Sequence, residues 1–443
     1  TKGNLELKGT GTVINAPTNE KEAAAVISGD ILAQAGSTSQ IGKLVADNLA
    51  VGVAQTSGAS GTAGTYTLNA GATLGVKTVS VANGTLNVTG DKAALTTDEL
   101  TLASGTSGSV STSGALTTGK FTNNGTVTIS GAKSALTVTG EAANNASGTV
   151  ALENSGAIVL AEGSTFKNAG TISGTGTLTV AGTLTNIGTL NVSSTTVKGT
   201  LNNTSETVNG VTTAGNVSGT SLTVDGVVNT KFDNYTVTMT TVNEGGTLNV
   251  LELNSKKASG ATTNDQLKLV QGVTLKGGKL TVAGADFAGN LLLDGSAAEF
   301  LIDGGDYTAK AVDFGTSGGK VTVQTGSYTV DSLNTTNGTV TVGDEGTLTV
   351  TTKLTAVSGA SSAPITVDGT LSTKLSALGY VYQTSGSGSL TTVSGGATAG
   401  AGSVQLNNGG ELVITDIGTD TLTKTEVTTL KSLTVSGSTG LVN

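Results

Sequence analysis

The sequence predicts an all-β protein built as a parallel β-helix, in which short strands stack in coils of roughly 18 to 21 residues. Three observations support this prediction. Gly is abundant, with 66 residues in a chain of 443, and it separates short runs of β-branched and aliphatic residues. Many of these runs alternate apolar and polar residues, which is typical of half-buried strands. The runs also return at a nearly constant interval, so each coil can bury its apolar face on the next.

The interval is clearest between Leu280 and Leu354. One set of alternating segments recurs about once per coil, and its members begin at Leu280, Phe300, Val321 and Val340. A second set recurs at nearly the same interval and comprises Phe287, Tyr307, Tyr328 and Leu348. Because the two sets keep step, we assign each of them to one column of stacked strands.

Residues 1 to 55 have a different pattern and are expected to form N-terminal strands and a cap. Two short strands are predicted at residues 4–8 and 11–14. Residues 20–27 and 41–49 then place apolar side chains at helical spacing. Two interpretations stay open for these segments: a partly helical cap over the open end of the solenoid, or irregular β-coils with longer loops.

Residues 56 to 253 are expected to form the first stretch of β-helix. They repeat a phrase of Gly-Thr, an aliphatic residue, Thr or Asn, and a second aliphatic residue, which also returns later in the chain. Its copies are Gly84–Val88, Gly125–Ile129, Gly176–Val180, Gly246–Val250 and Gly346–Val350. The period of two points both aliphatic side chains inward and the polar one outward. Gly supplies the tight corner at which one face gives way to the next.

A second phrase carries Asn shortly after an apolar residue. Its copies begin at Phe121, Phe166, Leu184 and Leu201. The last two intervals fit single coils, and the first, which is more than twice as long, fits two longer ones. Asn recurring at one corner predicts either a side-chain ladder or left-handed turn residues, and both roles are structural.

Residues 254 to 271 are predicted to form a loop insertion, after which residues 272 to 443 continue the β-helix. Loops on a solenoid commonly carry its specific contacts, so Lys256 and Lys257 are candidate contact residues. Tyr380 and Tyr382 alternate with Val381 and share one face of a predicted strand. They are candidates for an exposed aromatic contact with carbohydrate, and the alternative is packing in the core or against a partner.

Composition excludes several function classes. The net charge is −9 and the sequence pI about 4.6, which gives no electrostatic footprint for nucleic acid. No stretch reaches the roughly 18 consecutive apolar residues that a membrane helix needs. The chain contains no Cys, His or Arg, so Ser-His-Asp, Cys-His and His-metal sites are excluded. We therefore expect no enzymatic activity and no cofactor, with calcium as the one exception to consider.

Calcium is considered because carboxylates recur near the set that comprises Phe287, Tyr307, Tyr328 and Leu348. Asp294, Asp313 and Asp331 follow similar strand ends, about one coil apart, and are expected to stack on one edge. Asp303 and Asp306 lie close to them in the sequence. Carboxylates about one strand spacing apart can hold Ca²⁺ or act as the acid and base of a polysaccharide-active enzyme. The alternative is that Asp is a good turn residue, which any periodic chain repeats.

The Gly-Thr-Leu-Thr-Val and Asn-Asn-Gly-Thr-Val phrases, spread over most of residues 65–443, resemble β-helical passenger domains of bacterial autotransporters and filamentous-haemagglutinin-type adhesins. The resemblance implies a right-handed parallel β-helix at the bacterial cell surface, used for attachment to host or bacterial surface molecules. Low charge without Cys, His or Trp also resembles surface-layer and extracellular filament subunits. The first hypothesis is therefore a non-catalytic surface adhesin, and the second is a self-assembling structural subunit whose partner is another copy of the chain. The third is a polysaccharide-active enzyme.

Overall fold

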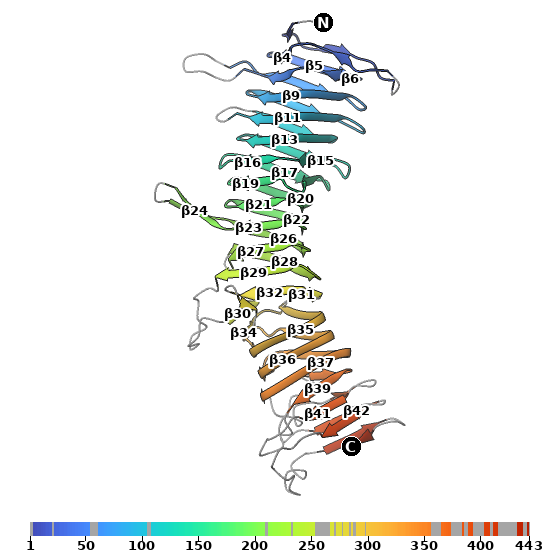
Figure 1. Ribbon diagram of the computed structural model, residues 1–443, viewed down its shortest axis with the longest axis vertical. Coiled ribbons are helices and arrows are strands. Elements are labelled where there is room, and N and C mark those ends of the chain that lie inside the picture. The colour runs from blue at the N-terminus through green and yellow to red at the C-terminus, as the bar shows by residue number, and fades with distance from the viewer. Residues whose placement is uncertain are drawn as a thin grey trace. The chain divides into compact units, whose positions relative to one another are not determined.

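The computed structural model describes the whole chain except residues 1–2, 20–21, 54–60, 104–107, 209–210, 232–233, 253–265, 270–271, 277, 283–284, 287–288, 297, 356–364, 374–382, 385–388, 393–402, 408–410, 415–431, 437–440 and 443. The described residues form no α-helix, and their strands stack in parallel as a β-solenoid of about 14 turns (Figure 1). The predicted fold class is therefore confirmed. The chain divides into two compact units, Thr1–Val237 and Thr238–Asn443.

Each regular coil of the first unit has three parallel faces, which the chain follows in the order A, B, C. Face A includes β8 (Gly64–Leu68), β10 (Gly84–Val88), β12 (Ser109–Thr112), β14 (Thr126–Ser130) and β17 (Thr149–Glu153). Long strands form faces B and C of the same coils: β9 (Thr73–Val81), β11 (Ala94–Leu102) and β13 (Ala115–Asn123).

Later in the first unit the long strands connect faces A and B instead, in β20 (Thr171–Val180), β22 (Thr189–Val197) and β26 (Asn216–Val224). Two short strands complete face B, β15 (Ala135–Val138) and β18 (Ala157–Leu160). Face C continues through β16 (Glu141–Asn144), β19 (Thr165–Asn168), β21 (Thr183–Asn186), β23 (Thr200–Asn203) and β27 (Val227–Lys231).

Alternation along each strand decides which side chains form the core. In β10, Leu86 and Val88 are fully buried while Thr85 and Asn87 point outward, as the Gly-Thr phrase predicts. Gly84, at φ +143°, stacks on Gly64 of the preceding coil, where a Cβ would lie only 2.0 Å from the Gly64 carbonyl oxygen. Gly at this corner is therefore required by the close approach of two backbones.

The N-terminal segments form β-coils, so the helical interpretation is wrong. The strands are β1 (Leu5–Leu7), β2 (Thr12–Asn15), β3 (Ala25–Val26), β4 (Asp30–Ala33), β5 (Gly36–Ile41), β6 (Lys43–Val45) and β7 (Asn48–Val51). Leu44 and Leu49 point into the core, whereas Ile41 and Val45 are exposed. Gly42, at φ +80°, separates β5 from β6 and prevents a continuous helix. The helical spacing arose because two short strands meet at this corner.

The predicted Asn ladder is confirmed, and it lies inside the core at the end of face C. Its members, all at most 2% exposed, are Asn123, Asn144, Asn168, Asn186 and Asn203. Each Nδ2 donates to the Oδ1 of the next Asn at 2.7 to 2.8 Å, and the last donates to Thr230 Oγ1 at 3.1 Å. Each Nδ2 also donates to a backbone carbonyl oxygen, which satisfies its second hydrogen.

The long interval from Phe121 to Phe166 also resolves as predicted, into two coils. Phe121 pairs with Ala142 of the next coil, and Ala142 pairs in turn with Phe166 of the coil after it. The small Ala142 side chain leaves room for the two rings to meet edge to face, with centroids 6.1 Å apart and planes at 89°.

The second unit starts within β28 (Tyr235–Asn243) and consists of shorter and longer strands with the same parallel stacking. They are β29 (Thr247–Glu252), β30 (Gln266–Leu269), β31 (Gly272–Lys276), β32 (Lys279–Val282), β33 (Ala285–Asp286), β34 (Asn290–Leu293), β35 (Glu299–Phe314), β36 (Lys320–Asn334), β37 (Thr339–Thr355), β38 (Ile365–Val367), β39 (Thr370–Thr373), β40 (Gln383–Thr384), β41 (Ser389–Thr392), β42 (Ser403–Asn407), β43 (Glu411–Ile414), β44 (Ser432–Ser436) and β45 (Leu441–Val442). Within the predicted loop insertion of residues 254–271, the described residues are those of β30.

One step of the predicted register is wrong. Phe300, Val321 and Val340 do stack in one column, but the residue that pairs with Phe300 from the preceding coil is Val273 and not Leu280. Leu280 pairs with Leu248 on another face. The coil from Val273 to Phe300 is longer than those that follow it, because it carries the antiparallel pair β32–β33. Tyr307, Tyr328 and Leu348 pair as predicted, and Phe287 lies outside the described residues.

Candidate functional site: a groove beside a projecting hairpin

The sequence-predicted carboxylates do not share one register. Asp313 aligns with Leu292 and Asn334, while Asp294 accepts a hydrogen bond from the backbone N–H of Ser317 at 3.1 Å. Asp331 accepts one from Thr351 Oγ1 at 2.9 Å. The expected stack of Asp294, Asp313 and Asp331 on one edge is therefore wrong, because the column that contains Asp313 repeats every 21 residues whereas the three Asp residues recur after 19 and 18 residues.

Asp303 and Asp306 also accept hydrogen bonds from the next coil. Asp303 accepts from Thr325 Oγ1 at 3.4 Å and Asp306 from Ser327 Oγ at 2.5 Å. Over the part of the chain that the structure describes, no group of three or more acidic side chains gathers closely enough to hold a metal ion. Calcium binding stays an untested prediction. The four candidate contact residues, Lys256, Lys257, Tyr380 and Tyr382, lie outside the described residues.

A groove that sequence reasoning missed lies on the outer side of face C. The regular stacking is interrupted after Asn203 by an antiparallel hairpin, β24 (Ser205–Val208) and β25 (Val211–Ala214). Figure 1 shows this hairpin extending away from the stacked coils. Between face C and the base of the hairpin is a cavity of about 480 Å³. Its volume falls within the range that is common for small-molecule sites.

The floor of the groove is made by outward-facing side chains of three successive face C strands. Glu141, Thr165 and Thr183 pair in one column, and Lys167 pairs with Thr185 in the next. Because parallel strands stack about 4.8 Å apart, these side chains form a two-column polar array. Ala142, Phe166 and Ile187 lie beneath this array in the core and are at most 9% exposed.

The wall of the groove is formed by Thr204, Ser205 and Glu206 at the start of the hairpin. Glu206 reaches back across two coils and receives both of its ion-pair contacts from Lys167, with Nζ 2.8 Å from each carboxylate oxygen. Both side chains are still about half exposed, at 51% for Lys167 and 41% for Glu206. The pair therefore joins hairpin and solenoid while remaining accessible from solvent.

The sequence did contain a signal for this hairpin. Asn209-Gly210 lies between Val208 and Val211, and Asn-Gly between β-branched residues is a strong indication of a two-residue hairpin turn. The repeat pattern obscured this signal, because Ser205–Ala214 has the same Ser, Thr, Val and Gly composition as the stacked coils. The strands pair from Ser205 with Ala214 to Val208 with Val211, as that turn requires.

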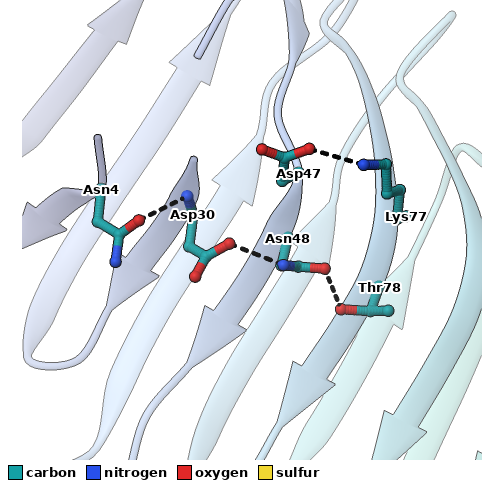
Figure 2. Close-up of polar contacts among 6 residues, drawn as sticks. All are labelled: Asn4, Asp30, Asp47, Asn48, Lys77 and Thr78. Carbon is teal, nitrogen blue, oxygen red and sulfur yellow. Dashed lines mark hydrogen bonds and ion pairs between the residues drawn. The ribbon is translucent and has the colours of Figure 1, made fainter. Parts of the chain in front are cut away.

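A second polar patch lies on face C of the N-terminal coils and is shown in Figure 2. A chain of hydrogen bonds joins Asn4, Asp30, Asn48 and Thr78 of successive coils (Figure 2). The Asp30 backbone N–H donates to Asn4 Oδ1 at 3.1 Å, and Asn48 Nδ2 donates to Asp30 Oδ1 at 2.7 Å. Thr78 Oγ1 donates to Asn48 Oδ1 at 2.5 Å. Beside them Lys77 Nζ lies 2.9 Å from Asp47 Oδ1. The hydrogen bond to Asp47 and its charge, together with the charge of Asp98, raise the pKa of Lys77. This patch is a closed ladder whose polar groups satisfy one another.

Among the described residues no helix is long and apolar enough to cross a membrane. Comparisons with protein-family models, with curated proteins and with solved structures find no match for this chain.

Proposed function

We propose that this protein is a bacterial surface adhesin, a non-catalytic β-solenoid that works outside the cell by attachment to host or bacterial surface molecules. The observation that carries the proposal is the departure from regular stacking at β24–β25, which builds an accessible groove on an otherwise repetitive polar surface. Solenoids commonly place binding contacts at such insertions, because the stacked coils supply a rigid support.

The inventory of side chains supports a binding role over catalysis. The chain has no His, Cys or Arg to act as nucleophile, base or anion clamp. Its remaining ionisable side chains are Asp, Glu, Lys and Tyr, and at the groove Lys167 and Glu206 neutralise each other in an ion pair. A site of this kind is suited to hydrogen bonding with a ligand that it does not alter.

The proposal is tested by displaying the full chain on the surface of a non-adherent bacterium. We expect the displaying cells to aggregate or to attach to cultured host cells several times more than cells carrying the empty display vector. Light microscopy and counts of adherent cells measure both effects. Equal counts for the two strains, with display verified by antibody, would contradict an adhesin function.

A second candidate function, self-assembly into a surface layer or filament, is favoured by apolar side chains exposed in the N-terminal coils. Val26 and Val45 pair on neighbouring strands and are 59% and 42% exposed. Covering them against another copy would remove apolar surface from water. Analytical ultracentrifugation at rising concentration checks this candidate, with Val26→Ser/Val45→Ser as the comparison variant. A purely monomeric wild-type protein at high concentration would eliminate it.

A further inference from the structure

The groove offers hydrogen-bonding groups of both kinds in a regular array. Its hydroxyls belong to Thr165, Thr183, Thr185, Thr204 and Ser205, and each hydroxyl can donate and accept. Lys167 adds a donor, and the carboxylates of Glu141 and Glu206 add acceptors. A ligand that matches this lining must itself present donors and acceptors close together along its length. Sugar hydroxyls have this property, because each of them donates one hydrogen bond and accepts others.

The charges at the groove select among polyhydroxylated ligands. Lys167 and Glu206 offset each other at 2.8 Å, and Glu141 makes no ion pair with any residue that the structure describes. The groove therefore has an excess of one negative charge, in a protein whose net charge is −9. Sulfated or carboxylated glycans are repelled by this arrangement, whereas neutral glycans are not.

The apolar residues beneath the floor, Ala142, Phe166 and Ile187, are at most 9% exposed, so a ligand in the groove meets the outward-facing Thr, Lys and Glu side chains. The volume of about 480 Å³ suits a short segment of a chain and not a whole polymer.

We propose that the groove between face C and the β24–β25 hairpin binds a short segment of a neutral oligosaccharide. Thr183 and Thr185 on the floor and Glu206 on the wall are its hydrogen-bonding residues. This inference rests on the proposed adhesin function and names the class of surface molecule that the adhesin recognises. The Lys167–Glu206 pair holds the wall over the floor, and its exposed atoms lie where ring hydroxyls of the glycan can bridge them.

The experiment measures binding of the purified full chain to an array of neutral hexose and N-acetylhexosamine oligosaccharides, with heparin oligosaccharides and unstructured peptides on the same surface. The test variant is Thr183→Val/Thr185→Val, which removes two hydroxyls with almost no change in shape. The control is Thr177→Val/Thr179→Val, which makes the same change on face B of the same coil. Circular dichroism verifies that both variants keep the strand signal.

We expect wild type and the Thr177→Val/Thr179→Val control to bind at least one neutral oligosaccharide equally. Binding by Thr183→Val/Thr185→Val should be weaker by about tenfold or more, since two hydrogen bonds are lost. Glu206→Gln should weaken the same interaction, because the wall loses its ion pair. Binding to heparin or peptides only, no binding to any oligosaccharide, or equal loss in the control variant would each overturn the inference.

The adhesion assay separates this inference from the proposed function. Cells displaying Thr183→Val/Thr185→Val are expected to lose adhesion along with glycan binding. If the displayed wild type adheres but the array shows no neutral glycan, the adhesin proposal stands and the glycan inference is overturned. If the array binds and cells do not adhere, the adhesin proposal fails while the groove remains a glycan site.

Discussion

The Asn-ladder coils of the first unit and the aromatic coils of the second unit solve the same stacking problem in opposite ways. Between residues 120 and 231 the polar groups at one corner point inward and form the buried ladder from Asn123 to Asn203. Between residues 299 and 355 the strands turn at Gly304-Gly305 and Gly326, all with positive φ, and the coil-to-coil contacts of Asp306 with Ser327 and of Asp331 with Thr351 are exposed.

The contribution of a coil-to-coil hydrogen bond to the free energy of unfolding therefore depends on whether the bond is buried or exposed. A buried amide that loses its partner cannot be rescued by water, so the whole ladder depends on each member. An exposed contact such as Asp331 with Thr351 exchanges its partner for water at little cost. The following experiments test this contrast.

The largest effect is expected for Asn168→Ala in the middle of the ladder. The substitution leaves one hydrogen of Asn144 Nδ2 and the Oδ1 of Asn186 without their ladder partners in the core, while Asn144 Nδ2 keeps its bond to the Thr171 carbonyl oxygen. We expect a loss of about 3 to 5 kcal/mol in the free energy of unfolding. Urea denaturation followed by circular dichroism measures it, and hydrogen exchange should show the loss of protection in residues 141–186. A loss below about 1 kcal/mol would contradict a cooperative ladder.

Alkaline pH is expected to have the next largest effect. Burial raises the pKa of Tyr66 in the first unit and of Tyr328 in the second well above the ordinary value of 10.0. Because the unfolded chain releases these protons first, stability is fully present below pH 10 and falls as the pH rises above it, by about 1.4 kcal/mol per pH unit for each tyrosine. Urea denaturation at pH 8 and pH 11 checks the slope. Identical stability at both values would contradict the burial of these phenols.

Replacing the same tyrosines by Phe should give effects of different sign. Tyr66 donates to Gln40 Oε1 at 2.7 Å, so Tyr66→Phe leaves a buried acceptor unpaired and costs about 1 to 3 kcal/mol. The buried hydroxyl of Tyr328 has no hydrogen-bond partner among the described residues, so Tyr328→Phe should be neutral or stabilising. Denaturation midpoints of the two variants at pH 7 provide the measurement. Equal destabilisation would show that Tyr328 is hydrogen-bonded.

The smallest effect is expected for Asp331→Ala. Its contact with Thr351 is exposed, and we expect the free energy of unfolding to change by no more than about 0.5 kcal/mol. It is measured in the same denaturation series as Asn168→Ala and serves as its control. A loss comparable to that of Asn168→Ala would remove the distinction between buried and exposed ladders.

Much of the fold followed from the sequence because alternation and period are local properties. The inward positions of Leu86 and Val88 and the two-coil interval from Phe121 to Phe166 were predicted from spacing alone, and a side-chain ladder was one of two roles predicted for the recurring Asn. Each of these features depends only on strand geometry and on residues one coil apart.

The candidate site was predicted poorly, for a reason that is also physical. Asp recurring about once per coil suggested a column, yet the coil at this position has 21 residues and the intervals of 19 and 18 residues place Asp294, Asp313 and Asp331 out of register. The groove depends on the base of a hairpin, where the Glu206 side chain reaches back to Lys167 across 39 residues. A pattern of neighbouring residues in the sequence does not predict a contact between residues 39 positions apart.

The stack of parallel β-coils could be derived from the residues alone, because the side-chain period of two and the recurring Gly corners leave few other structures. The length of each coil, the residues that align between coils and the places where the surface departs from the repeat depend on contacts made in the folded chain. The alternation of a strand is unchanged when a coil gains a hairpin such as β32–β33 or β24–β25. The position of every outward side chain relative to its neighbour, and with it the binding groove, is therefore set by stacking in three dimensions.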